Sequence, residues 1–268
     1  MAPGSAGPAG SARPADPAGS AGEAAGSAVV FATCVGDLVS PDVPERTLGL
    51  LRDVGCDASA ARGTTCCGQP AFSSGHVDAA RRVARTTLRA LDRTEGDIVV
   101  VAGSCAAMMR HHWRELFHGD RDEEMARRVS ARIRETSQAL AARLPALRRL
   151  GLRWEGRVGY HDSCHMLREL RVRDAPREVL GAVDGVELVD LRHGDRCCGF
   201  GGTFSVRYPG VSVAMADTKL EEVADLQLDA LVSCDGGCLM QLGGRADATR
   251  QDVRAIHLVD LLEESRPR

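Results

Sequence analysis

The sequence predicts an α/β fold made of two pseudo-repeated lobes, each a small, mainly parallel sheet covered by helices. The first reason is a cysteine repeat, in which four cysteines recur 130, 131, 131 and 133 positions later: Cys34/Cys164, Cys66/Cys197, Cys67/Cys198 and Cys105/Cys238. The second reason is that short apolar strands alternate with amphipathic helices in both halves. Because this alternation is typical of parallel sheets with helices on their faces, the chain reads as a duplicated α/β unit.

The first half gives the order of elements. Residues 29–34 (VVFATC) form a short strand that ends in a cysteine, and a helix and a weak strand follow before the C-C-G loop at 66–68. Apolar residues then recur at helical spacing over 73–93. Residues 97–105 (DIVVVAGSC) form a buried β-branched strand that ends at a cysteine in a turn, and 106–117 form a helix.

The second half repeats this order. A strand over 157–164 ends in a cysteine, and a second C-C-G loop occupies 197–199. A helix is predicted over 208–226, and a buried strand over 229–238 again ends at a cysteine. The segment 255–265 supplies a last strand and helix. Both halves therefore predict the same small parallel sheet.

Composition sets the boundaries between these parts. Ala, Gly, Pro and Ser dominate residues 1–28, which cannot bury enough apolar surface to offset the entropy of ordering, so a disordered tail is expected there. Lobe 1 is expected over 29–119 and lobe 2 over 157–263. The charged residues 120–156 between them are expected to form a helical linker.

Charge and composition exclude several classes of function. A net charge of -3 and an aromatic content of 3% argue against nucleic-acid binding. No stretch is long and apolar enough for a transmembrane helix, and the tail lacks the apolar core of a secretion signal, so we expect a cytoplasmic protein. Thiols stay reduced in that compartment. The 10 cysteines therefore indicate metal or redox chemistry rather than a disulfide framework.

The repeated cysteines are expected to meet at one edge of each sheet. Ligands of α/β sheets bind beyond the carboxyl ends of the strands, where the first and last cysteine of each set lie. The C-C-G loops bring two more thiols, and Gly68 and Gly199 permit a positive φ that lets each loop wrap a compact group. Cys105 and Cys238 are expected near helix N-termini, which favour the thiolate form.

Four thiolates in one half can bind either one Zn²⁺ ion or one iron–sulfur cluster. Structural zinc sites usually use C-x2-C pairs, whereas two adjacent cysteines with two distant ones suit a larger group. An iron–sulfur cluster also fits thiolates in a reducing compartment. Zinc remains the alternative.

Long motifs around the cysteines carry a family resemblance. The double pattern C-x31-C-C-G-x36-C and C-x32-C-C-G-x38-C resembles the CCG cysteine-rich domain, present twice, over about residues 29–263. This domain occurs in one of the subunits of heterodisulfide reductase, in the glycolate oxidase iron–sulfur subunit and in the lactate utilization protein A family. The chain is most similar to the last of these, through TCCGQPAFSSG, GSCAAMMRHH, YHDSCHMLREL, DRCCGFGGTFSVRYPGVSVAM and VSCDGGCLMQLGG.

The resemblance implies a function and a cofactor. Members of the lactate utilization family work with two partner proteins, one of which carries ferredoxin-type clusters, in oxidising L-lactate to pyruvate in the cytoplasm. The resemblance to heterodisulfide reductase implies a [4Fe–4S] cluster in each domain. We therefore expect one or two iron–sulfur clusters per chain, held by the eight repeated cysteines.

The sequence departs from the five-cysteine pattern of the heterodisulfide reductase relatives. Their fifth cysteine comes from a C-x2-C that this chain lacks, since Met108 and Gln241 stand at those positions. Cys234 is a candidate fifth thiol for the second half because it lies four residues before Cys238. Four-cysteine clusters, or a cluster in one half alone, are the other options. Cys56 has no counterpart in the repeat and is expected to be a buried structural thiol.

Three polar residues close to Cys164 are candidate catalytic groups. His161, Asp162 and His165 could move protons during electron transfer or tune a cluster, while Asp162 could equally cap the following helix. The leading hypothesis is an iron–sulfur subunit of an L-lactate oxidation complex. A redox subunit like those of heterodisulfide reductase or glycolate oxidase is the first alternative, and a zinc-stabilised, non-catalytic module is the second.

Overall fold

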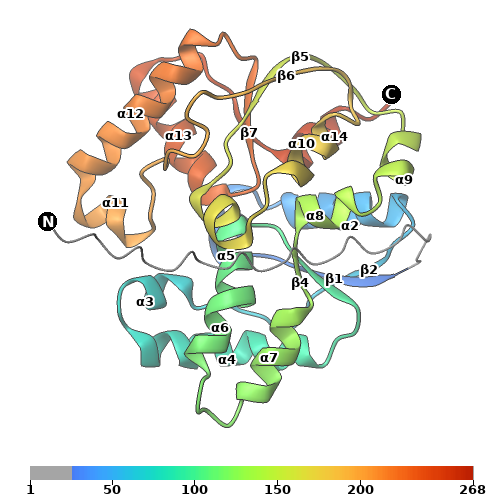
Figure 1. The fold of residues 1–268 in the computed structure, drawn as a ribbon, viewed down its shortest axis with the longest axis vertical. Coiled ribbons are helices and arrows are strands. Elements are labelled where there is room, and N and C mark those ends of the chain that lie inside the picture. Colours follow the sequence, from blue (N-terminus) through green and yellow to red (C-terminus); the bar gives the residue numbers. More distant parts are fainter. Residues whose placement is uncertain (1–25, 268) are drawn as a thin grey trace, which may run out of the picture.

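The computed structural model describes residues 26–267, which form two lobes that pack against each other (Figure 1). The expected disordered tail therefore lies largely outside the described residues, and its last two positions already belong to the first strand. The predicted α/β class with two lobes, each a parallel sheet covered by helices, is confirmed. Within residues 26–267, no helix has both the length and the apolar character needed to cross a bilayer.

Lobe 1 is built on a four-stranded parallel sheet with the order β2-β1-β3-β4. Its strands are β1 (Ser27–Phe31), β2 (Asp57–Ala60), β3 (Asp97–Val100) and β4 (Ile133–Glu135). Its helices are α1 (Cys34–Val39), α2 (Val43–Asp53), α3 (Gln69–Ser73), α4 (Val77–Asp92), α5 (Gly103–Ala107), the π-helical turn η1 (Met108–His112), α6 (Trp113–Leu116), α7 (Glu123–Ala131), α8 (Thr136–Ala141) and α9 (Leu144–Arg149).

Lobe 2 repeats the topology with the order β6-β5-β7-β8, again all parallel. Its strands are β5 (Arg153–Tyr160), β6 (Asp184–Val189), β7 (Ala230–Ser233) and β8 (Ala255–His257). Its helices are the π-helical turn η2 (His165–Leu170), α10 (Asp174–Leu180), α11 (Thr203–Arg207), α12 (Pro209–Asp225), α13 (Gly236–Thr249) and α14 (Leu258–Glu264). The central strands β1, β3, β5 and β7 are the apolar strands that the sequence predicted.

The expected helical linker at 120–156 is corrected by the structure. It contains α7, α8 and α9, but also β4, which pairs in parallel with β3, and the first residues of β5. Ile133 aligns with Ile98 and is fully buried in lobe 1. This segment is therefore part of both sheets, because tertiary pairing overrides the local helical preference of a three-residue strand.

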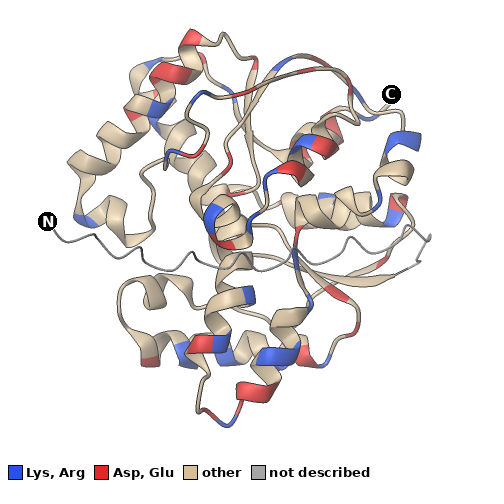
Figure 2. Cartoon of the chain, in the orientation of Figure 1, with Lys and Arg blue, Asp and Glu red and all other residues tan. Residues whose placement is uncertain are grey.

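Alternation along the strands divides the core into three layers. In β1, Ala28 and Val30 face a central core between the two sheets, whereas Val29 and Phe31 face an outer core under α4, α6 and α7. Lobe 2 has a matching outer core under α12 and α13. Figure 2 shows charged residues on the outer helices α4, α7 and α12, while α3 carries none.

Candidate functional site

The positions of the thiols follow from the order of strands in each sheet. The direction in which the chain winds along the sheet reverses between β1 and β3, and again between β5 and β7, so the loops after these strands diverge and leave a crevice at the carboxyl edge. Cys34 begins α1 directly after β1, and Cys105 lies in the first turn of α5 after β3. Cys164 and Cys238 take the same places after β5 and β7. The four cysteines expected at strand ends are therefore found there.

In lobe 1, the C-C-G loop completes a group of four thiols. The Cys34 thiol donates to Cys66 Sγ at 3.5 Å, and the Cys67 thiol donates to Cys105 Sγ at 3.3 Å. The two pairs join through Cys66 and Cys67, whose side chains also interact with each other. Cys34 is exposed, whereas Cys67 and Cys105 are buried in the outer core.

Lobe 2 repeats the same group of thiols. The Cys198 thiol donates to Cys238 Sγ at 3.2 Å, and Cys164 interacts with Cys197, which in turn contacts Cys198. The repeat extends to a backbone hydrogen bond in each C-C-G loop. The Gly68 N–H donates to Cys66 Sγ, and the Gly199 N–H donates to Cys197 Sγ, both at 3.4 Å. Each lobe thus gathers its four predicted thiols.

Both C-C-G glycines have the predicted left-handed backbone, with φ of 91° at Gly68 and 89° at Gly199. Each also lies against the helix that follows the loop. A Cβ at Gly68 would sit 2.9 Å from the Ala80 carbonyl oxygen in α4, and one at Gly199 would overlap the Ser212 carbonyl oxygen in α12. Glycine is needed at both positions for conformation and for this close approach.

Electrostatics within each group favour the thiolate form of the first cysteine of the C-C-G loop. Hydrogen bonds from Cys34 and Cys67 lower the pKa of Cys66, and hydrogen bonds from Cys164 and Cys198 lower the pKa of Cys197. The same interactions, together with burial, raise the pKa of the donors Cys34 and Cys164. Four thiolates packed this closely repel one another, so full deprotonation requires cations among them.

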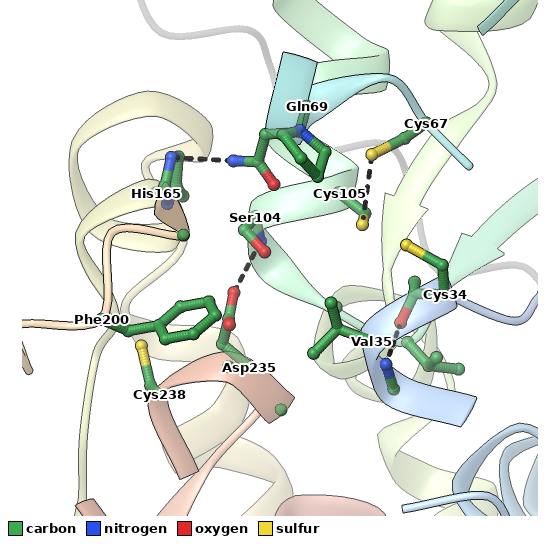
Figure 3. A pocket seen from close by; sticks show the side chains of 18 of the residues that line it. Cys34, Val35, Cys67, Gln69, Ser104, Cys105, His165, Phe200, Asp235 and Cys238 are labelled. Carbon is green, nitrogen blue, oxygen red and sulfur yellow. Dashed lines mark hydrogen bonds between the residues drawn. The ribbon is translucent and has the colours of Figure 1, made fainter. Parts of the chain in front are cut away.

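A cavity of about 310 Å³ joins the two groups of thiols. In Figure 3, Cys34, Cys67 and Cys105 lie on one side of it, and Cys238 lies on the other beside the ring of Phe200. Among the described lining residues, Asp235 is the one Asp, Glu, Lys or Arg side chain. The cavity is therefore mostly apolar apart from sulfur, with one acidic group.

Contacts between the lobes tie the two thiol groups together. The Asp235 carboxylate, at the N-terminus of α13, accepts the backbone N–H of Ser104 in α5 at 2.8 Å. These two helices carry Cys238 and Cys105. On the other side, the Gln69 amide, directly after the first C-C-G loop, lies 3.1 Å from His165 Nε2. The helix N-termini that hold thiols from different lobes are therefore in direct contact.

His161 lies within the lobe 2 thiol group. Strand alternation explains this position, because Val158 and Tyr160 face the central core and the next residue faces the outer one. One of its ring nitrogens and the sulfur atoms of Cys198 and Cys238 all lie within 4.8 Å of one another. The side chain is fully buried, and neither ring nitrogen has a hydrogen-bond partner among the described residues. Burial, with a contribution from Lys219, lowers the pKa of His161 to about 3, which keeps the ring neutral.

Asp162 and His165, the other two candidate catalytic residues, have different surroundings. Asp162 does not cap a helix, since its carboxylate is held by both terminal nitrogens of Arg177 in α10, at 2.6 and 3.0 Å. His165 lines the cavity and lies 3.6 Å from Cys164 Sγ through Nδ1. The structure therefore gives Asp162 a structural ion pair and leaves His161 and His165 beside the thiols.

Cys234 and Cys56 lie apart from both thiol groups. Cys234 shares the inward face of β7 with Ala230 and Val232, so it enters the central core and interacts with Glu135 and Tyr160. This face is opposite to that of Cys198 and Cys238, and the expectation of a fifth thiol from Cys234 has no support in its position. Cys56 is also in the central core, and its thiol donates to the Gly26 carbonyl at 3.0 Å.

Lys219 and Glu135 are among the buried charged residues that sequence reasoning did not anticipate. Lys219 in α12 is 1% exposed and donates to the His193 carbonyl at 2.6 Å, just before the second C-C-G loop. Glu135, at the end of β4, is fully buried at the lobe junction, where burial raises its pKa to about 7. Lys219 falls on the apolar stripe of its helix, and that mismatch was a signal in the sequence.

The donor set suits a thiophilic metal group. Each lobe offers four sulfur atoms on rigid helix termini and one tight loop, and a positive counter-charge would relieve the repulsion among the thiolates. Lobe 2 adds a neutral, unpartnered imidazole at the same place. The residues therefore fit the iron–sulfur cluster or zinc ion expected from the sequence.

Comparison with known proteins agrees with this architecture. Residues 28–110 and 158–243 both match the cysteine-rich domain (CCG) family. A lactate utilization protein A from Geobacillus kaustophilus is 40% identical over 235 residues, which are 87% of this chain and 97% of that protein. The protein of that name from Oceanobacillus iheyensis is 38% identical over 238 residues, 88% of this chain and 96% of its own length. The chain carries two CCG cysteine-rich domains and belongs to the lactate utilization protein A family.

Proposed function

We propose that this chain is the iron–sulfur subunit that carries electrons in an L-lactate oxidation system. The observation that carries the proposal is the meeting of two groups of four thiols at one cavity. Relatives named lactate utilization protein A supply the metabolic setting. An iron–sulfur cluster, when bound, would accept and release single electrons.

The chain's own residues would hold and insulate two such centres. Cys34, Cys66, Cys67 and Cys105 would hold one, and the four equivalent cysteines of lobe 2 would hold the other. The glycine of each C-C-G loop keeps the loop pressed on its helix, and the N–H groups that donate to Cys66 and Cys197 stabilise thiolates there. Since the Ser104–Asp235 contact joins the helices of Cys105 and Cys238, the two centres would be held at a fixed separation.

The charge of the cavity favours electron transfer over lactate binding on this chain. A carboxylate substrate is normally held by Arg or Lys, whereas the described lining offers neither and carries the acidic Asp235. The sequence also lacks a nucleotide-binding fingerprint for hydride transfer. We therefore assign the lactate chemistry to a partner and electron relay to this chain.

The resemblance also suggests the setting of this relay. We propose that the chain works with two other lactate utilization proteins, and that the one with ferredoxin-type clusters exchanges electrons with it. The cytoplasm suits this role because it keeps the cysteines reduced and available to metal.

Iron and acid-labile sulfide content of the anaerobically purified chain tests the cofactor. We expect about four of each per loaded lobe. The anaerobic chain, mixed with its two partners, is then followed by visible absorbance. Lactate should bleach the cluster band, and this bleaching should require the partners. A band that ignores lactate but is reoxidised by a disulfide would instead support the heterodisulfide-reductase-like alternative.

The lobe 2 site also favours one second candidate, a zinc-stabilised module. One histidine and two cysteines within 4.8 Å of one another are a ligand combination that Zn²⁺ accepts. Zinc at one or two ions per chain, with no iron or sulfide, would replace the electron-transfer proposal with this one.

A further inference from the structure

The two lobes differ at a position where a side chain other than cysteine lies against the thiol group. His161 lies three residues before Cys164, and Phe31 lies three residues before Cys34. Strand pairing confirms that they correspond. Phe31 aligns with Val100 of β3. His161 follows the aligned pair Tyr160 and Val232, and its backbone N–H donates to the Val232 carbonyl at 2.8 Å. Lobe 1 therefore has an apolar ring where lobe 2 has an imidazole.

The surroundings of His161 suit a ligand better than a packing residue. Burying a polar ring without hydrogen bonds costs free energy, and within residues 26–267 the fully buried His161 ring has no hydrogen-bond partner at either nitrogen. Phenylalanine would fill the same space without that cost, as it does in lobe 1. Ligand atoms around one tetrahedral metal stand roughly 3.5–4 Å apart, given metal–sulfur and metal–nitrogen bonds of about 2.0–2.3 Å. A ring nitrogen of His161 and the sulfur atoms of Cys198 and Cys238 lie within 4.8 Å of one another, so small side-chain movements would bring them to one metal ion.

We propose that His161 is a protein ligand of the lobe 2 metal centre, through an imidazole nitrogen beside Cys198 and Cys238, while the lobe 1 centre is held by thiolates alone. The identity of the metal group in this inference rests on the proposed function, whereas the assignment of His161 as a ligand does not. Because neutral imidazole adds no negative charge, the lobe 2 centre should take up an electron more readily than the lobe 1 centre. The two centres would then differ in reduction potential.

Two histidines that line the cavity, His257 and His165, are alternative ligands to be distinguished from His161. His257 has both nitrogens engaged, with the Val101 carbonyl and the Val259 N–H. His165 Nδ1 lies 3.6 Å from Cys164 Sγ, but its Nε2 contacts Gln69. His165 is therefore the matched control, since it lies beside a different thiol of the same group and its Nε2 has a partner outside that group.

Pulsed electron paramagnetic resonance of the anaerobic, reduced full-length chain tests the ligand directly. We expect a nitrogen hyperfine coupling typical of a bound imidazole, which changes to the ¹⁵N pattern when the protein is labelled with ¹⁵N-histidine. The coupling should be lost in His161→Phe and retained in His165→Ala. Phe31→His should add an imidazole coupling at lobe 1. If His161→Phe does not fold, the labelled wild type and His165→Ala still decide the matter.

The opposite results are equally clear. The proposal would be overturned if the wild-type protein shows no imidazole coupling. It would also be overturned if the coupling survives His161→Phe or disappears in His165→Ala. Iron and sulfide assays on the same samples distinguish a failure of the His161 proposal from a failure of the proposed iron–sulfur function. If iron is bound but no imidazole coupling is seen, His161 is not a ligand, whereas the iron–sulfur function stands. If the chain binds zinc instead, Co²⁺ substitution allows the same coupling to be measured in the same variants.

Discussion

The two lobes share a scaffold closely but differ in the residues around their thiols. The helices after the C-C-G loops bury corresponding positions, since Ala80, Ala84, Leu88 and Leu91 of α4 match Ser212, Ala216, Leu220 and Val223 of α12. The same helices differ at one buried position, which is Thr87 in lobe 1 and Lys219 in lobe 2. At the end of the first strand of each lobe, Phe31 in lobe 1 corresponds to His161 in lobe 2. The two lobes share the packing and the sulfur atoms, while lobe 2 has a buried lysine and a buried histidine where lobe 1 has Thr87 and Phe31. The lobes should therefore hold similar metal groups with different properties.

The largest expected effect is the loss of iron from one lobe when a cysteine of that lobe is replaced. Cys67→Ala should remove the lobe 1 centre and Cys198→Ala the lobe 2 centre, because each is buried and contacts a second thiol of its own lobe. If both lobes are loaded, each variant should keep about half of the wild-type iron, measured together with sulfide after anaerobic purification.

The controls for this prediction are the two cysteines of the central core. Cys234→Ala and Cys56→Ala should keep the full iron content, since neither thiol faces a thiol group. Loss of iron in either control would contradict the grouping of thiols described here.

The next effect compares the two C-C-G glycines. Gly68→Ala and Gly199→Ala both force a side chain into left-handed backbone, at a cost of about 1–3 kcal/mol. Gly199→Ala should be the more destabilising, because its Cβ overlaps a backbone carbonyl of α12, whereas the Gly68 contact is 2.9 Å. The midpoint of thermal unfolding measures both. Gly244→Ala in α13, where a Cβ would meet nothing within 4 Å, should be neutral or slightly stabilising. Equal losses at the two loops would show that backbone conformation alone sets the cost.

Sequence reasoning predicted most of the framework because the repeat is strong. The cysteine offsets, the central strands and the glycine conformations follow from local patterns, and all appear in the structure. β4 was missed because three residues between helices carry too little periodicity, and only pairing with β3 makes them a strand. The Asp162–Arg177 ion pair was missed because it joins separate elements of lobe 2.

Strand alternation could have sharpened two expectations about the site. Cys234 was assigned by its distance from Cys238 along the chain, although alternation from Ala230 through Val232 directs it to the opposite face of β7. The same alternation in β5 directs His161 toward the thiols, which sequence reasoning treated as one option among several. The period of a strand is therefore a better guide to ligands than proximity in sequence.

The smallest effect concerns the buried charge that is present in lobe 2 alone. Lys219→Met should lower the reduction potential of the lobe 2 centre and leave that of lobe 1 unchanged, because a positive charge favours the more negative, reduced state. At separations longer than direct contact, and with an effective dielectric constant near 20, such a charge stabilises the added electron by on the order of 1–2 kcal/mol. This energy corresponds to a shift in reduction potential of roughly 40–90 mV for one electron. Anaerobic redox titration followed by electron paramagnetic resonance measures this shift.

Thr87→Val is the matched control for Lys219→Met. Thr87 occupies the corresponding place in α4, where its hydroxyl donates to the Cys66 carbonyl at 3.1 Å and accepts the Thr65 N–H at 2.9 Å. Its removal takes away a polar anchor of the C-C-G loop but no charge, so the lobe 1 potential should change little. An unchanged lobe 2 potential in Lys219→Met would contradict the prediction and show that this side chain does not set the potential of the centre. The difference between the lobes would then rest on His161 rather than on charge.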